Sequence, residues 1–146
     1  MSACGLCPDG DAAPAELVGP PLDAGGWSAG VLRGYEVPGW LAVYPPRHVG
    51  SADALSDTEA AGLGGALRRV TAAVRAATSC EKVYAVSFGE RLPHFHVLLM
   101  AVPPDLPSEQ RGAALLGAAA ALRDPGAARD VADRAGVLLR VPSGAT

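Results

Sequence analysis

The chain has 146 residues, a net charge of −3, and 49% hydrophobic against 18% charged residues. This composition supports a folded core without disulfides and argues against disorder, and the lack of a basic block argues against a nucleic-acid polymer as partner. No apolar run approaches the roughly 20 residues that span a bilayer, and the opening residues, MSACGLCPDG, lack the charged and apolar regions of a signal peptide. We therefore expect a cytoplasmic protein with no membrane partner.

The first 26 residues combine the pair Cys4-Gly-Leu-Cys7 with a stretch rich in proline, glycine and aspartate. In a reducing compartment, cysteines at this spacing indicate metal or redox chemistry more readily than a structural disulfide. The proline- and glycine-rich stretch predicts a loop with at most one short strand, near residues 16–19.

Two strands are expected next, at residues 27–32 and 39–44. The second is stopped by the prolines at 45 and 46, because proline cannot donate to the ladder of a sheet. His48 follows these prolines closely, where a short rigid exit can orient a side chain.

The segment Ser56-Asp57-Thr58-Glu59 has the pattern of a capping box, in which the Ser56 hydroxyl accepts the amide of Glu59 and the Glu59 carboxylate accepts the amide of Ser56. It predicts a helix that begins after Ser56 and ends near residue 78. The apolar positions at helical spacing, which we assign to the core in preference to a subunit interface, are Leu63, Leu67, Val70 and Val74.

A third strand is expected at residues 82–88 and a fourth at 93–102, joined as a hairpin by a turn at 89–91. The tail predicts two helices, at 108–122 and 125–135, and then a short apolar piece at 137–141.

The order of strands, helix, strands and helices predicts an α+β fold with an antiparallel sheet of about five strands. One main helix is expected to pack on this sheet, with additional helices at the C-terminal end. We expect one domain over residues 1–146, in which 1–26 form a zinc knuckle and loop, 27–103 the core, and 104–146 a helical extension.

The stretch RLPHFHVLLMAVP, residues 91–103, places two histidines two residues apart. On a strand, His94, His96 and Leu98 share one face. Two adjacent imidazoles suit three roles: a shared metal, a division between ligand and reactive group, or a buried pair with backbone partners.

The two cysteines, His48 and one of the strand histidines together make a Cys2His2 set, which suits a tetrahedral zinc ion and leaves the other histidine free. The alternative is a pair of free thiols near the N-terminus. The sequence favours zinc, because the histidines accompany the cysteines.

Two segments resemble the histidine triad (HIT) family. GWLAVYPPRHV, residues 39–49, resembles the family's G-H-x-L-V-x-P-K-R-H-V segment, and VYAVSFGERLPHFHV, residues 83–97, resembles its G-Q-x-V-P-H-x-H-x-H signature. The capped helix lies between the two, as in the family, and an N-terminal CxxC occurs in many bacterial members. The resemblance covers roughly residues 1–103.

Within this resemblance, Pro93 sets the register, because a proline commonly precedes the first histidine of the triad. His94 then corresponds to the first histidine, His96 to the second, and Leu98 to the third. The resemblance implies a structural zinc ion held by Cys4, Cys7, His48 and His94, with His96 as the nucleophile.

The activity that the resemblance implies is nucleotide hydrolysis or nucleotidyl transfer. His96 would attack the α-phosphorus of a nucleoside phosphate, phosphoramidate or dinucleoside polyphosphate, and water or another acceptor would release the nucleotidyl-His96 intermediate. The resemblance also implies a homodimer that pairs helices and extends the sheet.

The chain departs from the family pattern around the histidines. Leu98 cannot donate a hydrogen bond to phosphate, Glu90 stands where glutamine is usual, the loop around residues 89–92 is short, and the Pro-Arg that usually follows the signature is absent. Candidate substrate-binding residues are Glu90, Arg91, Leu98, Ser87 and Trp40.

Further side chains are weighed for the same site. Arg47 and Arg91 could compensate for the missing phosphate donor, although a solvated surface charge is the plainer interpretation of Arg47. Tyr35 and Trp40 could line a nucleobase pocket, although ordinary packing is the plainer interpretation of Trp40.

Three functions therefore remain open, with an enzyme favoured. The first is a divergent HIT-type nucleotide hydrolase or nucleotidyl transferase that uses His96. The second is an enzyme on the same scaffold that acts on a small non-nucleotide substrate, for example a biosynthetic one, with the zinc ion or His96 as its reactive group and a contribution from Glu90 or Cys80. The third is a non-catalytic binding protein stabilised by zinc.

Overall fold

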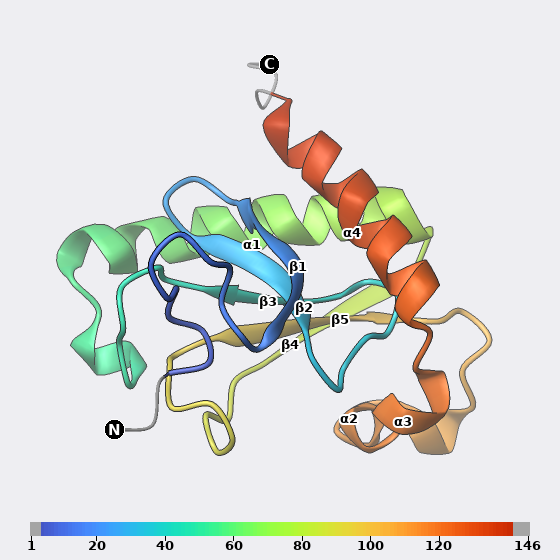
Figure 1. Cartoon of the computed structure of the whole chain (residues 1–146). Coiled ribbons are helices and arrows are strands. Elements are labelled where there is room, and N and C mark those ends of the chain that lie inside the picture. The colour runs from blue at the N-terminus through green and yellow to red at the C-terminus, as the bar shows by residue number, and fades with distance from the viewer. Residues whose placement is uncertain (1–3, 142–146) are drawn as a thin grey trace.

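The computed structural model describes residues 4–141, and its centre is a five-stranded antiparallel sheet (Figure 1). The strands lie in the order β1-β2-β3-β5-β4, and every neighbouring pair is antiparallel. Their bounds are Leu17–Asp23 for β1, Ser28–Leu32 for β2, Trp40–Tyr44 for β3, Lys82–Val86 for β4 and Val97–Val102 for β5. The predicted α+β fold is confirmed.

The main helix, α1, spans Asp57–Thr78 and begins with the expected capping box. The Glu59 amide donates to the Ser56 hydroxyl at 3.1 Å, and the Ser56 amide donates to the Glu59 carboxylate at 2.8 Å. Glu59 also pairs with Arg47 at 2.6 Å, which joins the helix start to the chain that leaves β3. A short 3-10 helix, η1, at Ala52–Ala54 precedes α1.

One face of the sheet is covered by α1 and by α4, which spans Pro125–Arg140 (Figure 1). Val70 and Val74 of α1 are fully buried there, and Leu63 and Leu67 are partly buried against the same core. The face buries the odd-numbered apolar residues of β5, as strand alternation requires. The apolar stripe of α1 is thus a core element in this chain.

The opposite face of the sheet carries a second apolar core, which includes Trp40, Leu98 and Met100. Leu6 of the N-terminal segment covers one part of it, and Leu115 near the C-terminal end covers another. The face is therefore covered by irregular segments and short helices instead of a long helix, and it leaves room for a cavity.

The segment after β5 differs from the single helix predicted over residues 108–122. It forms a 3-10 helix, η2, at Ser108–Gln110, then α2 at Ala114–Gly117 and α3 at Ala119–Leu122. Gly112 takes a left-handed φ of 69° and donates its amide to the Tyr84 hydroxyl at 2.9 Å, so the helix cannot run through it.

Helix α4, by contrast, runs past its expected end at residue 135. Gly136 is buried inside the helix, and a Cβ added there would lie 2.9 Å from Leu22 of β1. The glycine therefore allows α4 to approach the sheet closely and does not end the helix. Among residues 4–141, no helix has the length and hydropathy needed to cross a bilayer.

Strand bounds also differ, and β4 ends at Val86, two residues before its expected end at 88. β1 extends to Asp23, beyond the short strand expected near 16–19, with an irregular register between Val18 and Leu22. β5 begins at Val97, not at Pro93, so both histidines precede the strand. The Phe95 amide donates to the Val49 carbonyl at 2.6 Å, which holds this segment against the chain leaving β3 and outside the β4–β5 ladder.

Candidate functional site

Cys4, Cys7, His48 and His94 meet at one point of the structure, although the first and last are 90 residues apart. Their four candidate ligand atoms all lie within 4.8 Å of one another. His94 Nδ1 is 3.3 Å from Cys4 Sγ and 3.5 Å from Cys7 Sγ, and His48 Nδ1 is 3.4 Å from Cys7 Sγ. These side chains are thus close enough to bind a metal ion together.

The separations can be compared with those of a tetrahedral zinc site. Zinc bonds of about 2.3 Å to sulfur and 2.0–2.1 Å to nitrogen place the ligand sulfur and nitrogen atoms about 3.5 Å apart. The three sulfur–nitrogen distances of the cluster are close to this value. A Cys2His2 set of this kind is the donor chemistry that structural zinc prefers.

His94 is the buried member of the cluster, with no exposed side-chain surface. Its Nε2 lies 2.7 Å from the carbonyl oxygen of Pro45, so Nε2 carries the proton and donates it, while Nδ1 presents its lone pair to the cysteines. The proline that ends β3 therefore fixes which nitrogen of His94 faces the cluster.

The titration of the cluster also suits a metal. Burial lowers the pKa of His94, which favours the neutral imidazole that ligates metals. Burial, together with the neighbouring Cys4, raises the pKa of Cys7 to about 11. Cys7 is thus a protonated thiol in the metal-free protein, and metal binding must displace its proton.

His96 lies beside the cluster but faces elsewhere. Its Nδ1 is 2.8 Å from the carbonyl oxygen of His94, so Nδ1 is the protonated nitrogen and Nε2 keeps its lone pair. His96 lines a cavity of about 310 Å³ on the sheet face away from α1. The two adjacent histidines are therefore divided, one toward the cysteines and one toward the cavity.

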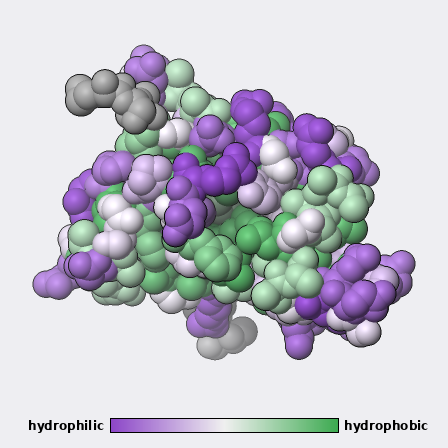
Figure 2. All heavy atoms as spheres, turned by 90° about the horizontal axis from the view of Figure 1, so that it is seen from below, coloured by the Kyte–Doolittle hydropathy of each residue, from purple (hydrophilic) through white to green (hydrophobic). Residues whose placement is uncertain are grey.

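The cavity is mainly apolar, with charged groups at its edge. Figure 2 views the molecule from the side opposite α1 and shows apolar side chains gathered at the centre of this face, with hydrophilic ones beside them. Leu98, only 5% exposed, lines the cavity next to His96. The remaining lining residues are Glu16, Leu32, Arg33, Tyr35, Val86, Phe88, Gly89, Glu90, Arg91, Leu92 and Leu116.

Four of the residues predicted for the substrate site line this cavity with His96: Glu90, Arg91, Leu98 and Tyr35. Trp40 does not. Its side chain is wholly buried, and its indole N–H donates to the Ala101 carbonyl at 3.3 Å, so packing is its role. Ser87 is also outside the lining, and its hydroxyl donates to the His96 carbonyl at 2.8 Å.

Two further residues weighed from the sequence lie away from the cavity. Arg47 is engaged with Glu59 and with the Ala54 carbonyl at the start of α1. Cys80 is buried in the core between α1 and the sheet. Neither contributes to the cavity wall.

The structure adds residues that sequence reasoning did not include. Arg33 and Glu16 line the cavity from the ends of β2 and of the N-terminal segment, and Phe88 lines it with 69% of its surface exposed. An aromatic residue directly before Gly89 was the available signal for Phe88. No local pattern marks Glu16, which reaches the site only through the folding of the N-terminal segment.

No protein-family model matches this sequence. No curated protein matches it either. Solved structures do match. A histidine triad protein from Bradyrhizobium japonicum is 23% identical with a TM-score of 0.60, over 82% of this chain and 85% of that one. A second histidine triad protein, from Sinorhizobium meliloti, is 21% identical with a TM-score of 0.61, over 79% and 87%.

A third similar structure comes from Sulfolobus tokodaii and is described as a hypothetical histidine triad nucleotide-binding protein. It is 12% identical, with a TM-score of 0.61 over 80% of each chain. At these identities the likeness is one of fold. The chain therefore has the fold of histidine triad proteins, and the fold expected from the sequence resemblance is confirmed.

Proposed function

We propose that this chain, which has the histidine triad fold, is a divergent histidine triad enzyme that hydrolyses or transfers nucleotides at their α-phosphate through His96. The single observation that carries the proposal is the contact between His96 Nδ1 and the His94 carbonyl oxygen. The His94 carbonyl accepts the Nδ1 proton at 2.8 Å, so the lone pair of Nε2 is free in a ring that lines the cavity. An imidazole oriented in this way, with Nε2 toward a cavity, is suited to nucleophilic attack.

The proposed reaction has two steps. Nε2 of His96 forms a bond to the α-phosphorus, and the bond from phosphorus to the leaving group breaks. The leaving amine or phosphate departs with the electron pair, and an amine takes up a proton from solvent. Water then attacks the phosphorus, releases Nε2 of His96 and the nucleoside monophosphate, and gives up a proton.

The metal of the four-residue cluster is proposed to be zinc in a structural role. The donor set is Cys2His2, and all four ligand positions are filled by the side chains of Cys4, Cys7, His48 and His94. A bound zinc ion would supply a positive charge that keeps the two cysteines as thiolates. Thiolate ligands fit a reducing compartment, so we propose the cytoplasm as the location.

The decisive experiment is to trap the covalent intermediate. The protein is incubated with adenosine and guanosine phosphoramidates and with dinucleoside polyphosphates, and the nucleotidyl-protein is sought by mass spectrometry. We expect an adduct on His96 and none in His96→Ala. The metal content of His96→Ala, which should equal that of the unchanged protein, is the control for folding. No adduct and no turnover with any substrate of the panel would sink the proposal.

A second candidate is favoured by the apolar character of the cavity. Leu32, Val86, Phe88, Leu98 and Leu116 give it a wall that accepts an apolar group more readily than a polyanion. An enzyme that uses His96 on a small apolar non-nucleotide substrate would fit this wall. Turnover of such a compound with no nucleotidyl adduct would favour this candidate.

We further propose that the protein is a homodimer. Strand β4 lies at the edge of the sheet, and β1, at the other edge, is covered by α4. An open edge of this kind can pair with a second sheet. Sedimentation equilibrium at micromolar concentration measures the mass directly, and a mass equal to the single chain would contradict the dimer.

A further inference from the structure

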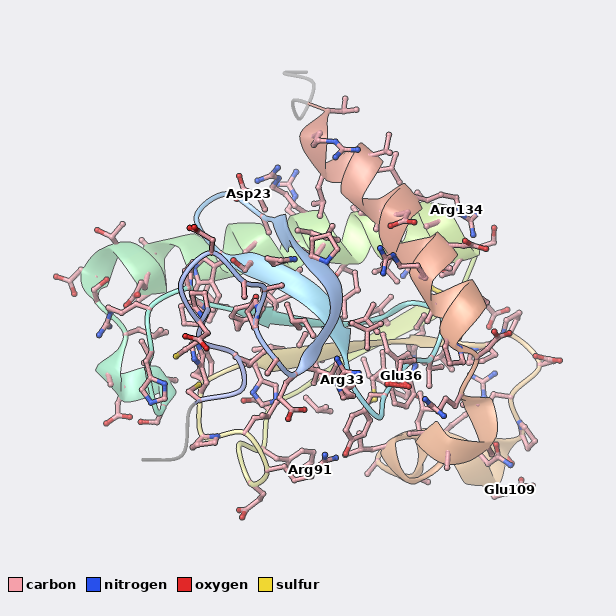
Figure 3. The ribbon with its side chains drawn as sticks, in the orientation of Figure 1. Asp23, Arg33, Glu36, Arg91, Glu109 and Arg134 are labelled. Atoms are coloured by element: carbon pink, nitrogen blue, oxygen red, sulfur yellow. The ribbon has the colours of Figure 1, made fainter. Side chains whose placement is uncertain are left out.

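Two arginines line the cavity that contains His96, and they differ in what they already hold. Arg33 donates from Nε to the Ala15 carbonyl and from Nη2 to the Leu17 carbonyl, both at 3.3 Å. Its guanidinium is therefore engaged by the backbone of the N-terminal segment. Figure 3 shows Arg33 and Arg91 on the side of the sheet away from α1.

Arg91 is less engaged. Its Nη1 donates to the Tyr35 hydroxyl at 3.0 Å, and its Cζ lies 5.4 Å from the centre of the Tyr35 ring. Within residues 4–141 its guanidinium makes no other hydrogen bond and no ion pair with Glu16 or Glu90. Several of its N–H groups are thus open to a ligand in the cavity.

Tyr35 can hold Arg91 because its own backbone is fixed. Its amide donates to the Leu32 carbonyl at 3.0 Å, and its carbonyl accepts the Val37 amide at 2.7 Å. The next residue, Glu36, is buried and anchored by the Gly34 amide and Arg123. The turn between β2 and β3 therefore presents the tyrosine ring as a rigid support.

We propose that Arg91, oriented by Tyr35, binds the phosphate oxygens of the substrate in the site where Leu98 offers no hydrogen-bond donor. The proposal rests on the proposed function and names the phosphate-binding group for it. Arg91 contacts the substrate, and Tyr35 is a positioning residue that acts through Arg91. A guanidinium is suited to this task because it offers two parallel donors to a phosphate and stays charged at all relevant pH values.

The two arginines also explain how the cavity can accept a phosphate beside acidic residues. Glu16 and Glu90 line the same cavity and would repel an anion, and Arg33 and Arg91 balance them in number. Removing Arg91 leaves the two carboxylates opposed by one backbone-engaged arginine. Substrate affinity should therefore depend strongly on Arg91.

The test measures AMP binding by calorimetry, independently of turnover. Arg91→Gln should weaken AMP binding about 10- to 100-fold, which is the usual worth of hydrogen bonds to a charged group. Arg91→Lys should recover part of the affinity. Arg68→Gln, on the exposed surface of α1, is the matched control and should bind AMP unchanged.

Tyr35 is tested by a double-mutant cycle. Tyr35→Phe should weaken AMP binding about two- to fivefold in the unchanged protein, since it removes one hydrogen bond. In the Arg91→Gln background the same change should have no further effect, because Tyr35 acts through Arg91. Equal effects in both backgrounds would overturn the positioning role.

The failure of this inference is distinguishable from that of the proposed function. If the nucleotidyl-His96 adduct forms but Arg91→Gln binds AMP as tightly as the unchanged protein, the inference falls and the function stands. If no adduct forms, pyrophosphate binding replaces AMP as the readout. If Arg91→Gln loses pyrophosphate binding, the phosphate-binding role of Arg91 is supported. If the unchanged protein binds neither pyrophosphate nor AMP, that role is overturned.

Discussion

The ring of His96 is held by the main chain of His94: Nδ1 of the former lies 2.8 Å from the carbonyl oxygen of the latter. The ring of His94 in turn lies 3.3 Å from Cys4 Sγ and 2.7 Å from the Pro45 carbonyl. Any displacement of the His94 backbone therefore also displaces the hydrogen-bond acceptor of His96. The candidate metal site and the candidate nucleophile form one connected unit.

Removing the metal should therefore affect both stability and the nucleophile. If free metal exceeds its dissociation constant about 1000-fold, chelation should lower the free energy of unfolding by about 4 kcal/mol. It should also loosen the hydrogen bond to His96, which nitrogen NMR shifts of its ring report. His96→Ala should bind metal normally. Unchanged ring shifts after verified metal removal would contradict the coupling.

Placing a histidine at the third triad position tests how the leucine there affects the rate of nucleotidyl transfer and the stability of the protein. Leu98→His places an imidazole next to His96 in the cavity, where it can donate to a phosphate oxygen. We expect faster nucleotidyl transfer, together with a loss of about 1–3 kcal/mol in unfolding free energy for a polar group at a buried position. Leu98→Met is the volume-matched control, with less than about 1.5 kcal/mol of lost stability and no gain in rate.

The start of α1 should show an acid dependence traceable to Glu59. The hydrogen bond from Arg47, followed by the Ser56 amide, lowers the pKa of Glu59 from 4.5 to about 2. A carboxylate with a lowered pKa contributes stability above pH 4.5 and loses it as pH falls toward 2. Glu59→Gln keeps the cap acceptor, so its stability deficit should be constant from pH 8 to about 5 and shrink below that. Chemical denaturation of both proteins across this range measures it, and a deficit that grows with acid would be the contrary result.

Gly39 should be nearly irreplaceable. It has a left-handed φ of 83°, and a Cβ there would lie 2.5 Å from the Cβ of Ala101. Gly39→Ala should therefore cost about 2–4 kcal/mol in unfolding free energy, from backbone strain and overpacking together. The matched control is Gly64→Ala, which lies in α1 with open space around it and should add about 0.5–1 kcal/mol. Similar thermal midpoints for the two variants would contradict this account.

The sequence predicted well where local chemistry decides the structure. The capping box at Ser56 and Glu59 placed the start of α1, and proline at 45 marked the end of β3. The convergence of Cys4, Cys7 and His48 with one of the strand histidines was expected because their donor types and spacing match one metal, and the resemblance identified that histidine as His94. The resemblance to histidine triad proteins supplied the division of roles between the histidines.

The sequence predicted less where distant contacts decide. Period-two alternation predicted that His94 and His96 lie in a strand. In the structure the Phe95 amide donates to the Val49 carbonyl, and β5 begins only at Val97. The last helix was expected to end at residue 135, but α4 continues to Arg140, and Gly136 inside it allows the close approach of Leu22. Trp40 was a candidate for the substrate site, with packing as the plainer interpretation, and the structure buries it in the core on the sheet face away from α1.

The candidate metal site has a consequence for the order of folding events. Its ligands come from the N-terminal segment, the exit of β3 and the approach to β5, so the full site exists only after loops spanning up to 90 residues have closed. Interactions that form this late stabilise the native state more than the transition state. We expect a bound metal to slow unfolding while leaving the folding rate almost unchanged. It would therefore increase the kinetic stability of the folded protein.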